Sequence, residues 1–184
     1  MLATRSRAQL LIIDVQQKLA PHVAGQQTVL ANCRRLVRYA QRLDVPITVT
    51  EHYPAGLGPT CAELAAVAGP DAPVFGKITF SSLKDEAIAT RLRKLKADGR
   101  DQIVVAGMEA HVCVGQTVLD LLQNGFQTLV VADAVGSRVA EVRQLALDRM
   151  ARAGAEIVSH EMIAFEWLER GDSTEFKDLI GVIK

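Results

Sequence analysis

The chain has 184 residues, 49% of them apolar, and its 21 Lys and Arg residues balance its 21 Asp and Glu residues. This length predicts a single domain over residues 1–184 with a substantial core. Because no block of like charge occurs and no apolar run approaches the roughly 20 residues that cross a bilayer, we expect no nucleic-acid and no membrane partner. We therefore expect a small-molecule or protein ligand.

The cysteines, Cys33, Cys61 and Cys113, are odd in number and widely spaced. This spacing argues against a disulfide framework and against a CxxC redox or zinc site. The first apolar stretch ends at Asp14 and is too short for the apolar core of a secretory signal, so it predicts a first strand instead. Together these features predict a cytoplasmic protein.

Short apolar runs alternate with longer segments of helical periodicity, which is typical of an α/β fold with a largely parallel sheet. Taken in chain order, the expected strands cover residues 9–14, 46–50, 74–75, 102–107, 128–132 and 156–158. The expected helices lie near residues 26–43, 61–68, 83–97, 113–124, 138–153 and 161–169. The strands are continuously apolar, as strands covered on both faces tend to be. We predict a three-layer, Rossmann-like, doubly wound parallel sheet of about six strands with helices on both faces.

One long irregular stretch, EHYPAGLGPT at residues 51–60, follows the second expected strand. Loops at the carboxyl ends of strands carry ligand contacts in open α/β sheets, so this loop is a candidate pocket wall. The nucleotide motifs of such folds are missing. No GxGxxG follows the first strand, and the run before Gly76-Lys77 has Asp71 at the position of the first P-loop glycine. We therefore expect no nucleotide cofactor.

Three side chains combine strand-end placement with reactive chemistry. Cys113 opens an expected helix, where free backbone N–H groups and the helix dipole would lower the pKa of a thiol and favour a nucleophilic thiolate. Asp14 ends the apolar run LLIID, where burying a carboxylate without a partner is energetically unfavourable. Lys77 lies in the apolar context VFGKITF and could supply a cation. Taken singly, these residues are better explained as a core cysteine, a turn-capping aspartate and a snorkelling lysine.

The order of several blocks resembles the isochorismatase-like cysteine hydrolase family across almost the whole chain. The blocks are LLIIDVQ, EHYPAGLGPT, VFGKITFSS, GMEAHVCV and VVADAVGSR, and their spacing is more specific than any one of them. The nearest subgroup resembles the isochorismatase domain-containing hydrolases, related to nicotinamidases and N-carbamoylsarcosine amidohydrolase. Members are commonly multimeric, so the resemblance implies a homo-oligomer.

Carried over by position, the resemblance implies that Asp14 is the general base, Lys77 stabilises the thiolate and developing charge, and Cys113 is the nucleophile. It also implies a cis peptide bond between Met108 and Glu109. The backbone N–H groups of Glu109 and Cys113 would then form the oxyanion hole. The implied reaction is hydrolysis of an amide or related C–N bond through a covalent intermediate on the cysteine.

The sequence departs from the family at the metal site of its nicotinamidase-like members. Where those proteins have an Asp-x-His pattern, this chain has Glu51, His52 and Tyr53. We therefore expect no metal and do not expect nicotinamide as the substrate. The sequence alone does not decide whether Glu51 or His52 contributes to the pocket.

Several neighbours of these motifs have candidate supporting roles. Gln16 resembles the family's DxQ glutamine, which would orient Asp14 or its surroundings. Tyr53 and Phe80 could shape an apolar pocket mouth, although core packing explains Phe80 equally well. His111 is too close in sequence to swing onto the cysteine, so we expect a structural or subunit-contact role. Arg138 could meet a substrate acid or pair at an interface.

Three other functions compete with amide hydrolysis. Vinyl ether hydrolysis of the isochorismatase type is one, but family members that perform it do not depend on this cysteine. A non-catalytic, oligomeric binding or scaffold protein is the second, and it predicts an unreactive Cys113. Sulfur transfer through a persulfide is the third, but the CVGQTV segment supplies no arginine for the anion-binding loop that it needs.

Overall fold

The computed structural model describes residues 1–183 and is built around one six-stranded sheet with the strand order β3-β2-β1-β4-β5-β6. Every neighbouring pair of strands is parallel. This is the order of the doubly wound Rossmann-like fold, which confirms the predicted fold class. The strands are β1 (Ala8–Ile13), β2 (Ile47–His52), β3 (Val74–Lys77), β4 (Gln102–Met108), β5 (Gln127–Gly136) and β6 (Glu156–Val158).

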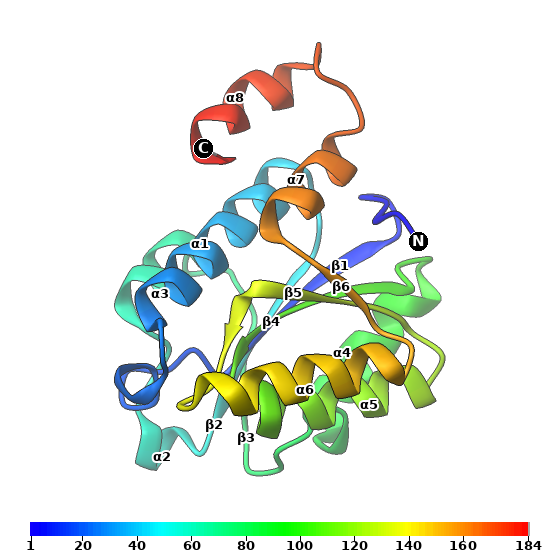
Figure 1. Ribbon diagram of the computed structural model, residues 1–184. Helices are drawn as coiled ribbons and strands as arrows, with labels where there is room; N and C mark the ends of the chain where they lie inside the picture. The colour runs from blue at the N-terminus through cyan, green and yellow to red at the C-terminus, as the bar shows by residue number, and fades with distance from the viewer. Residues whose placement is uncertain (184) are drawn as a thin grey trace.

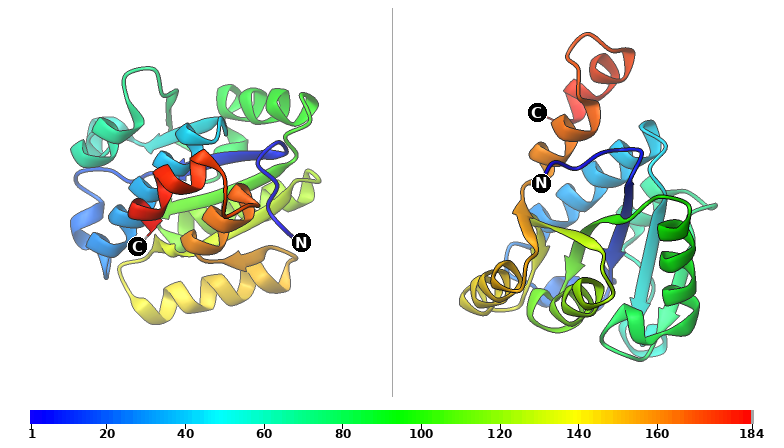
Figure 2. Two further views of the ribbon diagram at one scale, coloured as in Figure 1. Left: turned by 90° about the horizontal axis from the view of Figure 1, so that it is seen from above. Right: turned by 90° about the vertical axis from the view of Figure 1, so that its right-hand side faces the viewer.

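Helices connect these strands and cover both faces of the sheet (Figures 1 and 2). The α-helices are α1 (Gln26–Arg42), α2 (Pro54–Leu57), α3 (Ala62–Ala68), α4 (Glu86–Ala97), α5 (Gly115–Gln123), α6 (Ala140–Arg152), α7 (His160–Leu168) and α8 (Thr174–Ile183). Three shorter turns complete the set: η1 (Ala20–His22), η2 (Ser82–Lys84) and the π-helical turn η3 (Ala110–Val114).

The two faces of the sheet form two separate apolar cores. Side chains alternate along a strand, so Leu10 and Ile12 of β1 join the core under α1, α3 and α7, whereas Leu11 and Ile13 join the core under α4, α5 and α6. All six residues of β1 are buried. This explains why the sequence shows an unbroken apolar run there instead of an alternating pattern.

The structure extends four predicted strands at their carboxyl ends. β3 continues to Lys77 and β4 to Met108, beyond the predicted ends at residues 75 and 107. β2 continues to His52 and β5 to Gly136, beyond the predicted ends at residues 50 and 132. The polar residue Asp133 ended the apolar pattern in the sequence, but the backbone goes on pairing with β4, with a shift of register between Val105 and Gly107. The edge of the sheet that carries the candidate site is therefore longer than the hydrophobic pattern suggested.

Two helices were not predicted. α2 lies within the stretch that we expected to be irregular, and α8 follows α7 at the end of the chain. α8 buries Leu179 and Ile183 in the core shared with α1 and α7, and it lies farther from the sheet than either of them (Figures 1 and 2). The predicted helix over residues 113–124 begins two residues later, because η3 precedes it.

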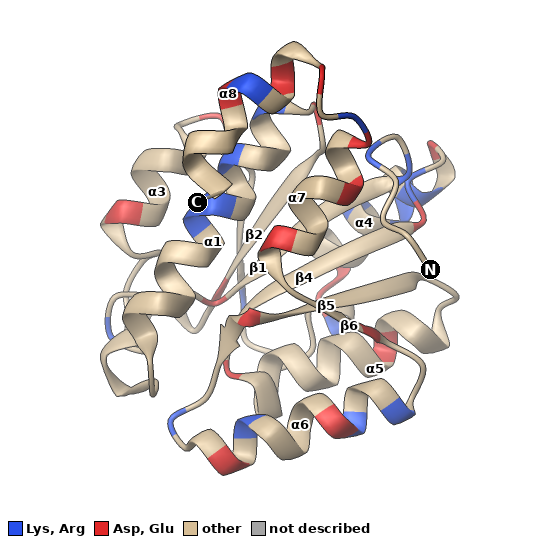
Figure 3. Cartoon of the chain, turned by 45° about the horizontal axis from the view of Figure 1, so that its top comes forward, with Lys and Arg blue, Asp and Glu red and all other residues tan. Residues whose placement is uncertain are grey.

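Charged positions of both signs are interspersed over the outer helices, for example along α6 (Figure 3). Within the part of the chain that the structure describes, no helix combines the length and apolarity that a membrane span requires.

The strand order also locates the candidate site. The chain winds in one direction from β1 to β3 and in the other from β4 to β6, so β1 and β4 are neighbours at the point where the winding reverses. Ligands of open α/β sheets bind at the carboxyl ends of the strands at this switch point. Asp14 directly follows β1, and η3, which carries Cys113, follows β4.

Candidate active site

Asp14 lies at the carboxyl end of β1 with its side chain fully buried. Its backbone N–H donates to the Thr50 carbonyl oxygen at 3.0 Å, and its φ of 53° lies in the left-handed region. That conformation is uncommon for a residue with a side chain, and such strain tends to cluster at functional sites. The backbone is therefore held in an unfavourable conformation where the carboxylate is presented.

A glycine allows β4 to approach this turn. Gly107 pairs with Ile13 across the β1–β4 ladder and has a φ of 125°. A Cβ atom at Gly107 would lie 2.0 Å from the Ile13 carbonyl oxygen, which is far inside van der Waals contact. No other amino acid fits here without moving one strand away from the other, so Gly107 sets the separation between the Asp14 turn and the segment that leads to Cys113.

Lys77 and Asp14 form an ion pair in which both side chains have no exposure to solvent. Lys77 Nζ donates to Asp14 Oδ2 at 2.7 Å and to the carbonyl oxygens of Thr79 and Phe80 at 3.2 and 3.1 Å, which uses all three of its N–H groups. Thr50 Oγ1 donates to Asp14 Oδ1 at 2.7 Å. The carboxylate keeps further lone pairs, so it can still accept a proton.

Cys113 lies in η3 with 5% of its surface exposed, close enough to Asp14 and Lys77 for both charges to act on its thiol. Burial and, after it, the negative charge of Asp14 together raise the pKa of Cys113 to about 12, while Lys77 opposes the shift. The expectation of a lowered pKa from the helix terminus is therefore wrong. Burial and the neighbouring carboxylate outweigh the helix terminus, and the thiol is protonated at neutral pH.

The segment before Cys113 turns sharply. The peptide bond between Met108 and Glu109 is cis, where the family resemblance placed it. The Glu109 carbonyl oxygen accepts hydrogen bonds from the backbone N–H groups of Val112 and Val114 at 3.0 and 3.2 Å. The next glycine closes the turn, since a Cβ atom at Gly115 would lie 2.8 Å from the Ala110 carbonyl oxygen.

The side chains on this segment are held by the two residues that follow β5. The buried Glu109 carboxylate accepts three hydrogen bonds from Arg138, one from its backbone N–H and two from its guanidinium. Arg138 thus pairs within the chain. The His111 ring lies 3.0 Å from Ser137 Oγ, which is a structural contact, as we expected for this residue.

The supporting residues take different positions. Gln16 is fully buried, and its side chain bonds both backbone groups of His52 as well as the Gly58 carbonyl oxygen, so it fastens the end of β2 to the following loop. Phe80 is 50% exposed and packs against the His52 ring at a centroid distance of 5.2 Å. Tyr53 is 52% exposed. Core packing is therefore the wrong explanation of Phe80.

The sequence analysis assigned no role to two residues that interact with the Asp14 carboxylate, one by a hydrogen bond and one through its charge. Thr50 was treated only as a strand residue, and the position of His52 was left open. Both lie on β2, which runs beside β1, so the parallel register could have indicated them once the strand order was known. Without that order, nothing local marks Thr50 as different from the other β-branched residues of its strand.

The residues at the family's metal position do not fit a metal ion. The Glu51 carboxylate accepts hydrogen bonds from the backbone N–H and the hydroxyl of Thr60, both at 2.7 Å. Among residues 1–183, no group of three or more His, Cys, Asp and Glu side chains is gathered as a metal site would require.

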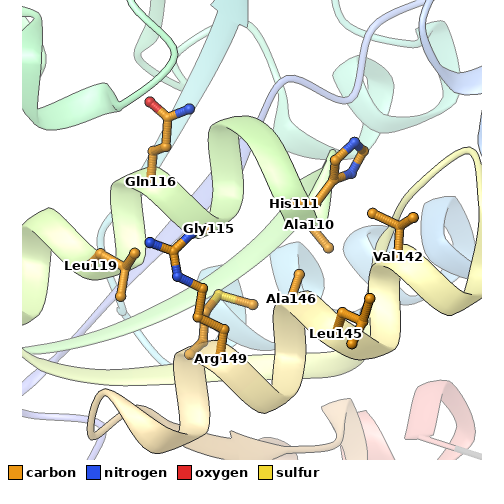
Figure 4. A pocket seen from close by; sticks show the side chains of 10 residues that line it. Ala110, His111, Gly115, Gln116, Leu119, Val142, Leu145, Ala146 and Arg149 are labelled. Carbon is orange, nitrogen blue, oxygen red and sulfur yellow. The ribbon is translucent and has the colours of Figure 1, made fainter.

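A cavity of about 230 Å³ lies elsewhere, between α5 and α6 (Figure 4). Its lining includes His111 from η3 and Arg149 from α6, but none of Asp14, Lys77 and Cys113. Because this cavity offers no nucleophile, whereas the switch point holds a thiol beside a buried carboxylate and ammonium, we place the candidate active site at the switch point.

The fold and this site define a Rossmann-like α/β protein with a cysteine at the switch point of its sheet. The isochorismatase domain matches residues 8–162. Isochorismatase domain-containing protein 2A of Mus musculus is 36% identical over 178 residues, which cover 95% of this chain and 82% of that protein. The chain therefore belongs to the isochorismatase family, which confirms the resemblance.

Solved structures agree with this assignment. The MAR1 ribonuclease of Caenorhabditis elegans has a TM-score of 0.92 and 32% identity, covering all of this chain and 92% of that one. YcaC from Pseudomonas aeruginosa, solved with hexane-2,5-diol and covalent acrylamide, has a TM-score of 0.90 and 27% identity over 98% and 91% of the two chains. YcaC from Escherichia coli, described as an octameric hydrolase of unknown specificity, gives the same TM-score and identity over 99% and 90%.

Proposed function

We propose that this protein is a cysteine-dependent hydrolase that cleaves an amide or related C–N bond of a small molecule. The observation that carries the proposal is the buried Asp14–Lys77 ion pair beside the Cys113 thiol at the switch point of the sheet. A buried ion pair is a costly arrangement, and side chains with perturbed protonation cluster at active sites. The related YcaC structure was solved with covalent acrylamide, which supports a reactive nucleophile in that relative.

In the first step, Cys113 Sγ attacks the carbonyl carbon while its proton passes to Asp14. A thiol with a raised pKa has to lose its proton as it attacks, and Asp14, a carboxylate that still has free lone pairs, is placed to accept it. The carbonyl oxygen becomes an oxyanion, held by the backbone N–H groups of Glu109 and Cys113. Lys77 balances the charge that moves between the thiol and the carboxylate.

The tetrahedral intermediate then collapses. The C–N bond breaks, the nitrogen leaves with the proton from Asp14, and the acyl group remains on sulfur as a thioester. In the second step, water gives a proton to Asp14 and attacks the thioester carbon. The C–S bond breaks, and the proton returns to sulfur, which releases the acid and restores the thiol.

Gln16, Tyr53 and Phe80 shape the surroundings of this reaction in the proposal. Gln16 holds the end of β2 in place, and the half-exposed rings of Tyr53 and Phe80 border the approach to the trio. We also propose a homo-oligomer, supported by the related octameric hydrolase, and a cytoplasmic location, which rests on the absence of a disulfide pattern.

The test is a screen of wild type and Cys113→Ser against a panel of amides, ureas and esters, with intact-mass spectrometry for a covalent adduct. One structural relative is named a ribonuclease, so the panel includes an oligoribonucleotide. Turnover that requires Cys113, together with a mass gain on wild type alone, supports the proposal. Equal turnover by both proteins overturns the mechanism, and a wild-type protein that neither turns over the panel nor gains mass supports a binding role instead.

A further inference from the structure

His52 lies at the carboxyl end of β2, between the strands that carry the ion pair. It pairs in register with Lys77 on β3, and Gln16 bonds both its backbone N–H and its carbonyl oxygen, at 2.8 and 3.0 Å. The Phe80 ring packs against the imidazole. The backbone and one side of the ring are thus held in place, although the mechanism above gives the imidazole no task.

One nitrogen of this ring has no partner. The Thr79 carbonyl oxygen lies close enough to the imidazole to oppose the lowering of the pKa of His52, whereas Nδ1 is buried and meets no hydrogen-bond partner among residues 1–183. In the neutral tautomer that carries its proton on Nε2, Nδ1 presents a buried lone pair. Leaving a buried polar atom unsatisfied is unfavourable, and natural proteins keep few of them. A donor from outside the protein would satisfy it.

The charges around the ring keep this lone pair available. Burial lowers the pKa of His52, and the positive charge of Lys77 on β3 lowers it further, whereas Asp14 at the end of β1 opposes this. Because the ordinary pKa of histidine is 6.5, the imidazole is neutral at pH 7. The ring belongs to a residue that pairs in register with Lys77, one of the proposed reacting groups.

We propose that His52 is a specificity-determining residue whose Nδ1 accepts a hydrogen bond from an N–H group of the substrate. The inference rests on the proposed function and narrows it: the preferred substrates are amides or ureido compounds whose carbonyl carries a nitrogen with at least one N–H. Fully substituted amides and esters offer no such donor and leave Nδ1 unsatisfied. A site built around a polar partner rejects an analogue that lacks it more strongly than an apolar pocket does.

The experiment compares covalent labelling of Cys113 by acrylamide and by N,N-dimethylacrylamide, which lacks the N–H donors. Both reagents form a C–S bond at the terminal vinyl carbon, the thiol proton passes to the α-carbon, and the amide remains intact to meet His52. Rates are followed by intact mass, assigned to Cys113 by peptide mapping, and divided by the rates of free glutathione to remove intrinsic reactivity. We expect wild type to favour acrylamide by roughly three- to tenfold, the worth of one hydrogen bond. The preference should persist at pH 7 and fall once the pH drops below the lowered pKa of His52.

Variants at this position separate hydrogen bonding from shape. His52→Phe keeps an aromatic ring against Phe80 without an acceptor, so it should lose the preference. His52→Asn places its oxygen near the position of Nδ1 and should keep most of it, whereas the longer amide of His52→Gln reaches toward the position of Nε2 and should not. If His52→Phe does not fold, the comparison of Asn with Gln decides the question in its place.

The outcomes distinguish this inference from the proposed function. If both reagents label Cys113 in the ratio seen with glutathione, or if His52→Phe keeps the wild-type preference, the role of His52 is wrong and the cysteine hydrolase proposal stands. If neither reagent labels Cys113 and no substrate is turned over, the proposed function itself fails, and the inference falls with it.

Discussion

Lys77 Nζ lies 2.7 Å from Asp14 Oδ2, and neither side chain has any exposure to solvent. Removing both charges from water is costly, and their attraction compensates only because Thr50 and two carbonyl oxygens satisfy the remaining hydrogen bonds. A pair of this kind is weak support for stability, but it has clear consequences when one partner is removed.

The first prediction concerns this pair. Lys77→Met leaves the Asp14 carboxylate buried without its cation, so we expect the free energy of unfolding to fall by about 3–5 kcal/mol. The double variant Asp14→Asn with Lys77→Met carries no buried charge and should recover part of that loss. Urea denaturation followed by circular dichroism measures both. A double variant that is no more stable than Lys77→Met would contradict the charge argument.

Asp14→Asn should separate thiol acidity from catalysis. The negative charge of Asp14 raises the pKa of Cys113, so removing it should lower that pKa below about 12. Ultraviolet absorbance of the thiolate against pH measures the shift. The same titration with Cys113→Ser added gives the contribution of Cys33 and Cys61, which is subtracted. Loss of the general base should at the same time reduce kcat by about 10²- to 10⁴-fold. An unchanged or raised thiol pKa would show that Asp14 does not act on Cys113.

The same raised pKa sets the pH dependence of labelling in the wild type. Iodoacetamide reacts with the thiolate, whose fraction increases with pH until the thiol is fully ionised. A cysteine with the ordinary pKa of 9.0 levels off above that value, whereas labelling of Cys113 should continue to rise beyond pH 9. A profile that reaches a plateau near pH 9 would mean that the thiol is neither buried nor influenced by Asp14 as described.

Thr50→Val tests a contact that the sequence analysis missed. Valine keeps the shape of the β2 side chain but removes the 2.7 Å hydrogen bond to Asp14 Oδ1, so the carboxylate can rotate. We expect kcat to fall by about 10- to 100-fold while KM changes little, because the geometry of the base is altered. Thr128→Val, on β5, is the control. Its hydroxyl bonds the Phe126 carbonyl oxygen, and its loss should leave kcat unchanged.

Gly107→Ala should damage the contact between the two strands at the site. Its added Cβ atom would meet the Ile13 carbonyl oxygen at 2.0 Å, and its φ of 125° is strained for alanine. Gly154→Ala is a matched control, since φ there is 107° and nothing lies within 4 Å of the added atom. Strain alone should cost the control about 1–2 kcal/mol. Thermal unfolding should show a clearly larger loss for Gly107→Ala, and equal losses would refute the close approach.

The sequence by itself determined the order of the elements and the fold class, because strands buried on both faces leave continuous apolar runs that helical periodicity does not imitate. It also indicated Asp14, Lys77 and Cys113 as unusual residues at strand ends, although only the family resemblance joined them into one site. Local patterns could not do so, since the three residues are separated by long stretches of chain and each has an ordinary structural explanation.

The tertiary structure determined the neighbours and the burial of these residues and the pKa shift of Cys113. The strand order placed Thr50 within hydrogen-bond distance of Asp14 and brought His52 under the influence of its charge, and burial left Nδ1 of His52 without a partner among the described residues. Burial and the Asp14 charge reversed the expected direction of the Cys113 pKa. These effects depend on distances and on the exclusion of water between segments remote in sequence, and no local pattern of residues records either quantity.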